Sequence, residues 1–202
     1  MMTNGARRLL SLAGGLLLPV PAALGAAPQE RTDKAAAPEV VVGIWPAAQR
    51  ATARALIDKY GRPAQYDSHA LAWFNNGIWK KTVIYRRSPL QGPNRDKEFL
   101  QQSVGYIVPA DKIAALKKFD KRLEVSQTAG EMTFTSDREA TNLLALNLAD
   151  EIVTGKRTVA SARAFFMRTT VLAAAGKSSP YRRDLRFNVD NNRYMTPGGA
   201  DR

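Results

Sequence analysis

The chain has 202 residues, 45% of them hydrophobic and 24% charged, with a formal net charge of +12. This length and apolar content predict one globular domain and exclude a wholly disordered chain. The absence of cysteine excludes disulfides, zinc–thiolate sites, thiol nucleophiles and a lipid-modified cysteine.

The first 26 residues have the layout of a secretory signal peptide. Arg7 and Arg8 precede a short apolar run, Leu9 to Val20, and small residues then allow cleavage after Gly25 or Ala26. The run is too short to span a membrane, and no later stretch approaches the required apolar length. We therefore expect an exported protein, periplasmic or secreted, without a transmembrane span.

Export changes what the positive charge means. Removal of residues 1–26 deletes two arginines and no acid, so the formal charge falls from +12 to +10. A strongly positive protein attracts polyanions. Because an exported protein rarely meets nucleic acid, an anionic envelope polymer or an envelope protein is the favoured partner. The alternative is that the charge only maintains solubility.

Composition divides the rest of the chain into a linker, a domain and a tail. Residues 27–43 are rich in Ala, Pro and charge and predict a flexible linker. A single domain is expected over 44–176, followed by a basic polar tail over 177–202. Leu185, Phe187 and Val189 alternate with polar residues, which predicts either a late strand or a segment that orders on binding.

The first part of the domain predicts a helix and a hairpin. Pro46 suits a helix start, and the helix is expected to stop at Gly61. A strand over 70–75 then reaches Asn76-Gly77, a strong hairpin signal, and 78–87 predicts the return strand.

The second part predicts strands and helices in alternation. The expected elements are a strand at 103–108, an amphipathic helix at 109–120, paired strands at 122–128 and 131–136, and helices at 137–154 and 159–175. Ser136 and Glu139 fit a capping box for the first of these last helices, and Thr158 can cap the second. This order predicts an α+β fold, a small antiparallel sheet with helices packed on one face and two C-terminal helices.

Three stretches resemble a family of exported bacterial proteins with no assigned function. They are ALIDKYGRP (55–63), AWFNNGIWKKTVIYR (72–86) and NLLALNLADEIVTGKRTVASAR (142–163), and the resemblance covers roughly 45–168. It implies export and a single domain, and it supplies no reaction, cofactor or active site. At the level of fold alone, the opening also resembles SmpA-type outer-membrane assembly modules. The chain departs from these because it lacks the lipid-anchor cysteine and adds two C-terminal helices.

The aromatic hairpin has two interpretations. By alternation, Trp73, Trp79, Val83 and Tyr85 form a core under the helices, while Lys80, Thr82 and Arg86 face solvent. Stacking of a sugar or base on a Trp side chain would leave a similar pattern. We favour the core. The cations of the hairpin, Lys80, Lys81, Arg86 and Arg87, then remain as its candidate functional residues.

The leading functional hypothesis is a non-enzymatic envelope protein that binds an anionic polymer or partner protein through a basic surface. The candidate contacts are Lys80, Lys81, Arg86, Arg87, Lys117, Lys118, Lys121 and Arg122, together with the basic tail.

Two other classes are kept as alternatives. Glu131, Asp137 and Glu139 cluster near a helix start and could serve a hydrolase of an envelope polymer. An apolar patch at Phe165 and Phe166 could instead seat another chain of an envelope complex.

Catalytic and metal motifs are otherwise weak. The single histidine, His69, has Asp67 and Ser68 beside it, but three nearly consecutive residues cannot form a nucleophile–base–acid relay. With one His and no Cys, we expect no metal site and no cofactor.

Overall fold

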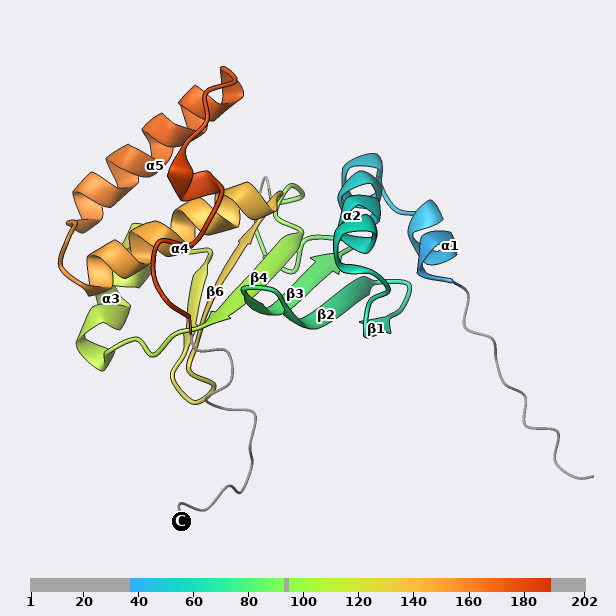
Figure 1. Cartoon of the computed structure of the whole chain (residues 1–202), viewed down its shortest axis with the longest axis horizontal. Coiled ribbons are helices and arrows are strands. Elements are labelled where there is room, and N and C mark those ends of the chain that lie inside the picture. Colours follow the sequence, from blue (N-terminus) through green and yellow to red (C-terminus); the bar gives the residue numbers. More distant parts are fainter. Residues whose placement is uncertain (1–36, 93–94, 190–202) are drawn as a thin grey trace, which may run out of the picture. The chain divides into compact units, whose positions relative to one another are not determined.

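The computed structural model describes residues 37–92 and 95–189 (Figure 1). The predicted signal peptide and the end of the predicted tail lie outside these residues. The helices are α1 (Pro38–Gly43), α2 (Ala47–Tyr60), α3 (Ala110–Phe119), α4 (Glu139–Val153), α5 (Val159–Ala174) and the short 3-10 helix η1 (Pro180–Arg182). The strands are β1 (Gln65–Tyr66), β2 (Ala70–Asn76), β3 (Trp79–Tyr85), β4 (Leu100–Gly105), β5 (Leu123–Ser126) and β6 (Glu131–Ser136).

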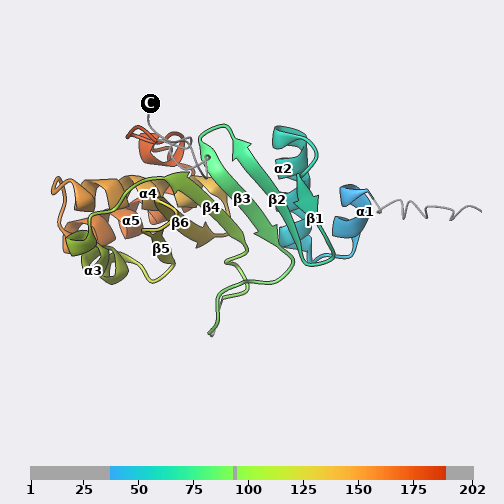
Figure 2. The same cartoon turned by 90° about the horizontal axis from the view of Figure 1, so that it is seen from below.

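The six strands form one antiparallel sheet in the order β1-β2-β3-β4-β6-β5. Figure 1 shows α2 over β2 and β3 and α4 over β4 and β6, and these helices contact these strands, while α5 packs against α3 and α4. Figure 2, turned by 90°, shows the long connection between β3 and β4 extending away from the sheet at the ends of these strands. The α+β prediction, including the two C-terminal helices, is confirmed.

The register defines which face of the sheet is buried. One row across the strands is Trp73, Thr82, Gln102, Phe134 and Leu123, and every member of it is buried. Paired residues point to the same face of a sheet. This row therefore marks the face that the helices cover.

The predicted hairpin forms, but its predicted core is wrong in part. Trp73 and Trp79 are buried as expected, whereas Val83 pairs with Ala72 and lies on the face opposite Trp73. Thr82, expected in solvent, is fully buried. The physical reason is the register of the hairpin. Trp73 pairs with Thr82 and Asn76 pairs with Trp79, so odd-numbered residues of β2 share a face with even-numbered residues of β3, whereas the prediction placed odd-numbered residues of both strands on one face.

The buried residues form two hydrophobic clusters. The first lies under α1 and α2 and includes Trp45, Leu56, Trp73 and Ile84. The second lies among α3, α4, α5 and strands β4 to β6, and its large members include Trp79, Leu116, Met132, Phe134 and Leu144. Each cluster gains its stability from apolar surface removed from water.

The beginnings of two helices differ from the expected pattern. Residues 38–43, placed in the predicted linker, form α1, whose Val42 is buried in the first cluster. The capping box at α4 is absent, since Arg138 occupies the cap position and no side-chain hydrogen bond caps the helix. The Ser136 hydroxyl instead donates to Asn142 Oδ1 over 2.6 Å. The expected cap of α5 is present, because the Ser161 amide donates to Thr158 Oγ1 over 3.2 Å.

The segment after α5 packs along α4. Asn147 donates from Nδ2 to the carbonyls of Tyr181 and Asp184 and accepts from the amide of Arg186 over 2.7 Å. Leu185, Phe187 and Val189 pack against the second cluster without forming a strand. One buried asparagine therefore makes three hydrogen bonds to the backbone of this segment, in addition to the apolar contacts.

We predict that Asn147→Ala will release this segment. The substitution leaves two carbonyls and one amide without partners, which should lower the free energy of unfolding by about 1–3 kcal/mol. Amides of residues 181–189 should exchange faster with deuterium than in the wild type. Asn188→Ala, at an exposed position of the same segment, is the control and should leave both quantities unchanged. Equal exchange in the two variants would contradict the anchoring role.

Candidate anion-binding clefts

The eight candidate cations lie in different environments, and Lys80 has a structural role. Its Nζ lies 3.0 Å from Glu131 Oε1 and donates to the carbonyl of Ala129, while only 14% of its side chain is exposed. The ion pair links β3 to the turn between β5 and β6. A cation that is already neutralised and shielded contributes little to the attraction of an external anion.

Arg122 is also paired within the protein. Its guanidinium contacts Asp120 at 2.7 Å and Glu98 at 3.5 Å, and it lies 4.8 Å from the centre of the Phe134 ring. Burial alone would lower the pKa of Arg122, but Asp120 and Glu98 outweigh it and raise the pKa. Arg122 therefore joins the end of α3 to the second cluster.

The two lysines at the C-terminal end of α3, Lys117 and Lys118, are exposed. Lys117 and Lys118 lie in the last turn of the helix, where a positive charge interacts favourably with the helix dipole. Lys117 and Lys121 line a cleft of about 480 Å³ beside the edge strand β5. Glu124 also lines this cleft. The helix dipole thus accounts for the position of Lys117 and Lys118, and the carboxylate of Glu124 partly offsets the positive charge in the cleft.

Arg86 and Arg87 line two clefts at the end of β3. The first, of about 340 Å³, is completed by His69 and Tyr85. The second, of about 580 Å³, lies between the first turn of α2 and the β3–β4 connection, where Gln49 and Leu90 contribute to its walls. Arg86 and Arg87 therefore line both clefts.

The charge in these clefts is mostly uncompensated. Neither guanidinium of Arg86 and Arg87 forms a hydrogen bond or ion pair with any residue that the structure describes, and Arg87 is exposed. The second cleft adds Lys97, and it contains one acid, Asp96. Arg95 also lines it but is paired with Glu98 at 2.7 Å. The result is a concave surface with a positive potential.

Backbone contacts position the two arginines. The amide of Arg86 donates to the carbonyl of His69 over 2.7 Å, which extends the pairing of β2 and β3 beyond the last strand residue. Phe99 is buried in the first cluster, and its carbonyl accepts from the amide of Tyr85. The base of the β3–β4 connection is thus fixed on both sides of the clefts.

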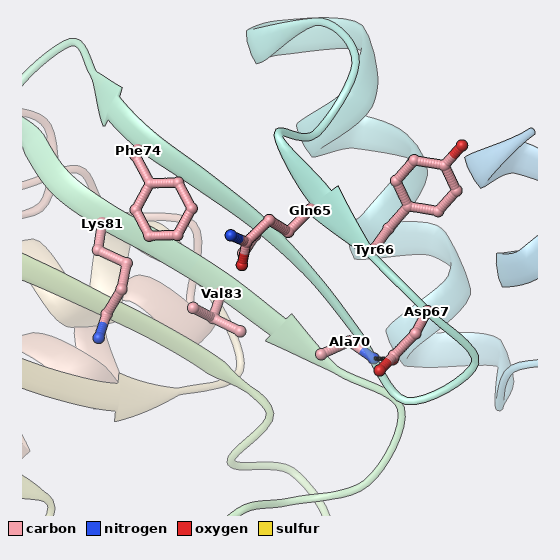
Figure 3. Close-up of a pocket in the computed structure, with 8 residues that line it drawn as sticks. Gln65, Tyr66, Asp67, Ala70, Phe74, Lys81 and Val83 are labelled. Carbon is pink, nitrogen blue, oxygen red and sulfur yellow. Dashed lines mark hydrogen bonds between the residues drawn. The ribbon is translucent and has the colours of Figure 1, made fainter. Parts of the chain in front are cut away.

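Lys81 lies in a separate groove on the open face of the sheet. Figure 3 shows Phe74, Val83 and Gln65 side by side over β1, β2 and β3. The groove has a volume of about 470 Å³ and a floor containing Ala70 and Ala72. Phe74 is 44% exposed, so the groove offers one ring face and one cation. This aromatic is the exposed one, not the tryptophans that the sequence singled out.

The candidate carboxylates are each engaged by a different cation. Glu131 pairs with Lys80, and Asp137 pairs with Arg138. Glu139 Oε1 accepts from Lys59 over 2.6 Å, and its Oε2 accepts from Tyr60 and Gln102 over 2.7 and 3.2 Å. None of the three lines any of the clefts described above.

His69 does not take part in a relay with Asp67. Asp67 Oδ1 accepts from the backbone amides of His69 and Ala70 over 2.7 and 2.9 Å. These bonds hold the pKa of Asp67 below its ordinary value. The aspartate therefore shapes the turn before β2, and the imidazole is left as a wall of the first arginine cleft.

Phe165 and Phe166 point inward rather than forming an outer patch. Phe165 contacts the Tyr181 ring at 4.9 Å, and Phe166 contacts Phe119 at 6.2 Å between ring centres. Both are half-buried against the second cluster. Among the large hydrophobic side chains of α5, Met167 and Val171 are the most exposed.

The structure identifies wall residues that sequence patterns could not. Gln49 lies far from Arg86 in the sequence, and Leu90 lies in the irregular connection between β3 and β4. Only the packing of α2 on β3 brings them together. The paired arginines at the end of a strand were the one signal available in the sequence.

Among residues 37–92 and 95–189, no group of three or more His, Asp or Glu side chains is placed to hold a metal ion. Within the same ranges, no helix has the length and apolar character needed to cross a bilayer. Comparison with protein-family models, curated proteins and solved structures found no match to the chain.

We predict that the three hydrogen bonds accepted by Glu139 make the stability of the fold depend on pH in the acid range. Burial would favour the neutral acid, but bonds from Lys59, Tyr60 and Gln102 outweigh it and hold the pKa of Glu139 below 4.5. A depressed folded-state pKa stabilises the fold above the unfolded value, and the stabilisation is lost as the pH falls through the folded value.

The free energy of unfolding should therefore decrease as the pH is lowered from about 5 toward 3, and the decrease should be smaller in Glu139→Gln. Tyr60→Phe keeps the carboxylate but removes one donor, so its loss should be intermediate. Urea unfolding at a series of pH values measures this. An identical slope in wild type and Glu139→Gln would refute the assignment.

Proposed function

We propose that this protein is an exported, non-enzymatic binding protein that takes an anionic group of an envelope polymer or partner protein at Arg86 and Arg87. The observation that carries the proposal is the pair of clefts lined by these two arginines, whose guanidinium groups have no partner among the described residues. Export itself rests on the sequence pattern of the first 26 residues.

The chemistry of arginine suits this role. A guanidinium presents several donors in a planar fork that matches carboxylate and phosphate oxygens. Two of them on consecutive residues, with Lys97 in the second cleft, can engage a group that carries two or more negative oxygens. The pocket walls are partly apolar, with Leu90 and Phe99 present, and low-dielectric walls strengthen the attraction.

Other cations are less suited to be the main contacts. Lys80 and Arg122 are internally paired, and their substitution would alter stability together with binding. The lysines at the end of α3 are exposed and serve in the proposal as a diffuse positive field that attracts a polyanion. The arginine clefts then supply the specific contact.

The carboxylates do not support the hydrolytic alternative. A glycosidase needs two carboxyl groups facing one substrate, whereas Glu131, Asp137 and Glu139 have separate cationic partners and line none of these clefts. No observation on the described residues favours that class over binding.

We predict that Arg86→Ser with Arg87→Ser will weaken polyanion binding selectively. The chain from Ala27 would be titrated calorimetrically with polyphosphate, a polyuronate and polyglutamate at low and high salt. The double variant should bind its best polyanion at least about tenfold more weakly, because two charge-assisted contacts are lost. Wild-type binding should weaken with salt.

Lys117→Ser with Lys118→Ser is the matched control. It removes the same net charge from two adjacent, exposed positions. Its affinity should change less than about threefold, because exposed charges act over distance and are screened. Equal losses in the two double variants would show that only net charge matters, and no binding to any polyanion at low salt would reject the proposal.

A further inference from the structure

The last long helix, α5, is apolar on two opposite sides. Its inner side carries buried Ala162 and Thr169, and half-buried Phe165 and Phe166. Met167 and Val171 are each 69% exposed, and Leu172 is 42% exposed. At about 100° per residue, Met167 and Val171 point directly away from the buried side. A helix on a protein surface ordinarily has a polar outer side.

The outer residues follow a regular spacing. Ala160, Ala164, Met167, Val171 and Ala174 are separated by four, three, four and three residues, and the structure leaves all five exposed. This spacing forms a seam along one side of a helix, as in helices that pair with another helix. The seam is carried by Met167 and Val171, while the alanines on either side leave room for a close backbone approach.

The charges beside the seam indicate the kind of partner. Residues 159–174 contain Arg163 and Arg168 and no acidic residue. Arg163 donates to the carbonyls of Lys118 and Phe119 at the end of α3, and Arg168 is exposed without a hydrogen bond or ion pair to a described residue. Lys156 and Lys177 flank the helix. Both ends and both borders of the seam are therefore positive.

We infer that the outer side of α5 docks a helix of another protein, with apolar residues at three- and four-residue spacing and acidic residues along its borders. Opposite charges on both borders of a helix pair favour this partner. A second copy of the chain would place arginines against arginines. A lipid surface would require a broader bulky apolar side, and here only Met167, Val171 and Leu172 are large.

The test uses a defined probe. A fluorescent helical peptide of about three heptads would carry Leu and Ala at the seam positions and Glu on its borders, and a second peptide would carry Lys in place of Glu. Anisotropy with the chain from Ala27 should show saturable binding of the Glu peptide. The Lys peptide should bind at least about tenfold more weakly.

Met167→Gln with Val171→Gln should weaken the Glu peptide at least about tenfold, because two apolar side chains no longer leave water on binding. Val40→Gln with Ile44→Gln is the matched control, since Val40 in α1 and Ile44 directly after it are also exposed, apolar and four apart. The control should remain within about twofold of wild type. Both variants change exposed side chains, and circular dichroism will verify that they are folded.

Four results would overturn the inference. One is equal binding of the Glu and Lys peptides, or binding that is unchanged in the Met167 and Val171 variant. Another is a wild-type dimer in sedimentation equilibrium that dissociates in this variant, which assigns the seam to a second copy. The last is binding to phosphatidylglycerol vesicles that only this variant loses. Arg86→Ser with Arg87→Ser should retain peptide binding. A failure of the proposed anion site can therefore be distinguished from a failure of the docking site on α5.

Discussion

The arrangement of the helices depends on a buried polar network around Gln102. This fully buried side chain donates from Nε2 to Glu139 over 3.2 Å and accepts at Oε1 from Asn142 over 2.9 Å. Glu139 in turn accepts from Lys59 and Tyr60 on α2. The network thus joins the end of α2, the middle of β4 and the start of α4, and it lies between two separate hydrophobic clusters.

Such a network stabilises one arrangement over others. Hydrophobic contacts are tolerant of small rotations, whereas buried donors and acceptors are costly when they are displaced from their partners. The C-terminal end of α2 is held a second time, because Trp73 Nε1 donates to the carbonyl of Gly61 over 2.9 Å. With this end fixed, the opposite end of α2 forms one wall of the larger arginine cleft. The cleft is therefore a consequence of the core.

Patterns in the sequence predicted the elements better than their contacts. Asn76-Gly77 signalled the hairpin because a tight turn requires unusual backbone angles. The face of Val83 was assigned wrongly, since the register of the hairpin pairs Val83 with Ala72 and not with a neighbour on the face of Trp73, and alternation within each strand does not fix that register. Ser136 and Glu139 matched a capping box, yet Ser136 bonds to Asn142 of the same helix and Glu139 bonds to distant Tyr60, and these partners compete with the cap bonds. Cap motifs of this kind depend on what packs nearby.

The cations show the same limit. Lys80 and Lys81 are adjacent, but one pairs with Glu131 and the other lines an open groove. Arg122 is close in sequence to Lys121, but it lies over Phe134 with two carboxylates beside it. Composition can give the sign of the protein's charge. Which cation is available to a ligand depends on the acids that the fold brings near each one, and these come from distant parts of the chain.

The two proposed surfaces belong to different parts of this organisation. The larger arginine cleft is formed by α2 and the β3–β4 connection, and the smaller one lies at the adjoining ends of β2 and β3, all in or beside the first cluster. The outer seam of α5 is on a helix whose contacts are with α3 and α4 in the second cluster. Energetic coupling between them would have to pass through the network at Gln102 and Glu139. Since that network has all its members paired in a single arrangement, it does not supply a two-state element. An anionic ligand and a helical partner should therefore bind independently of each other.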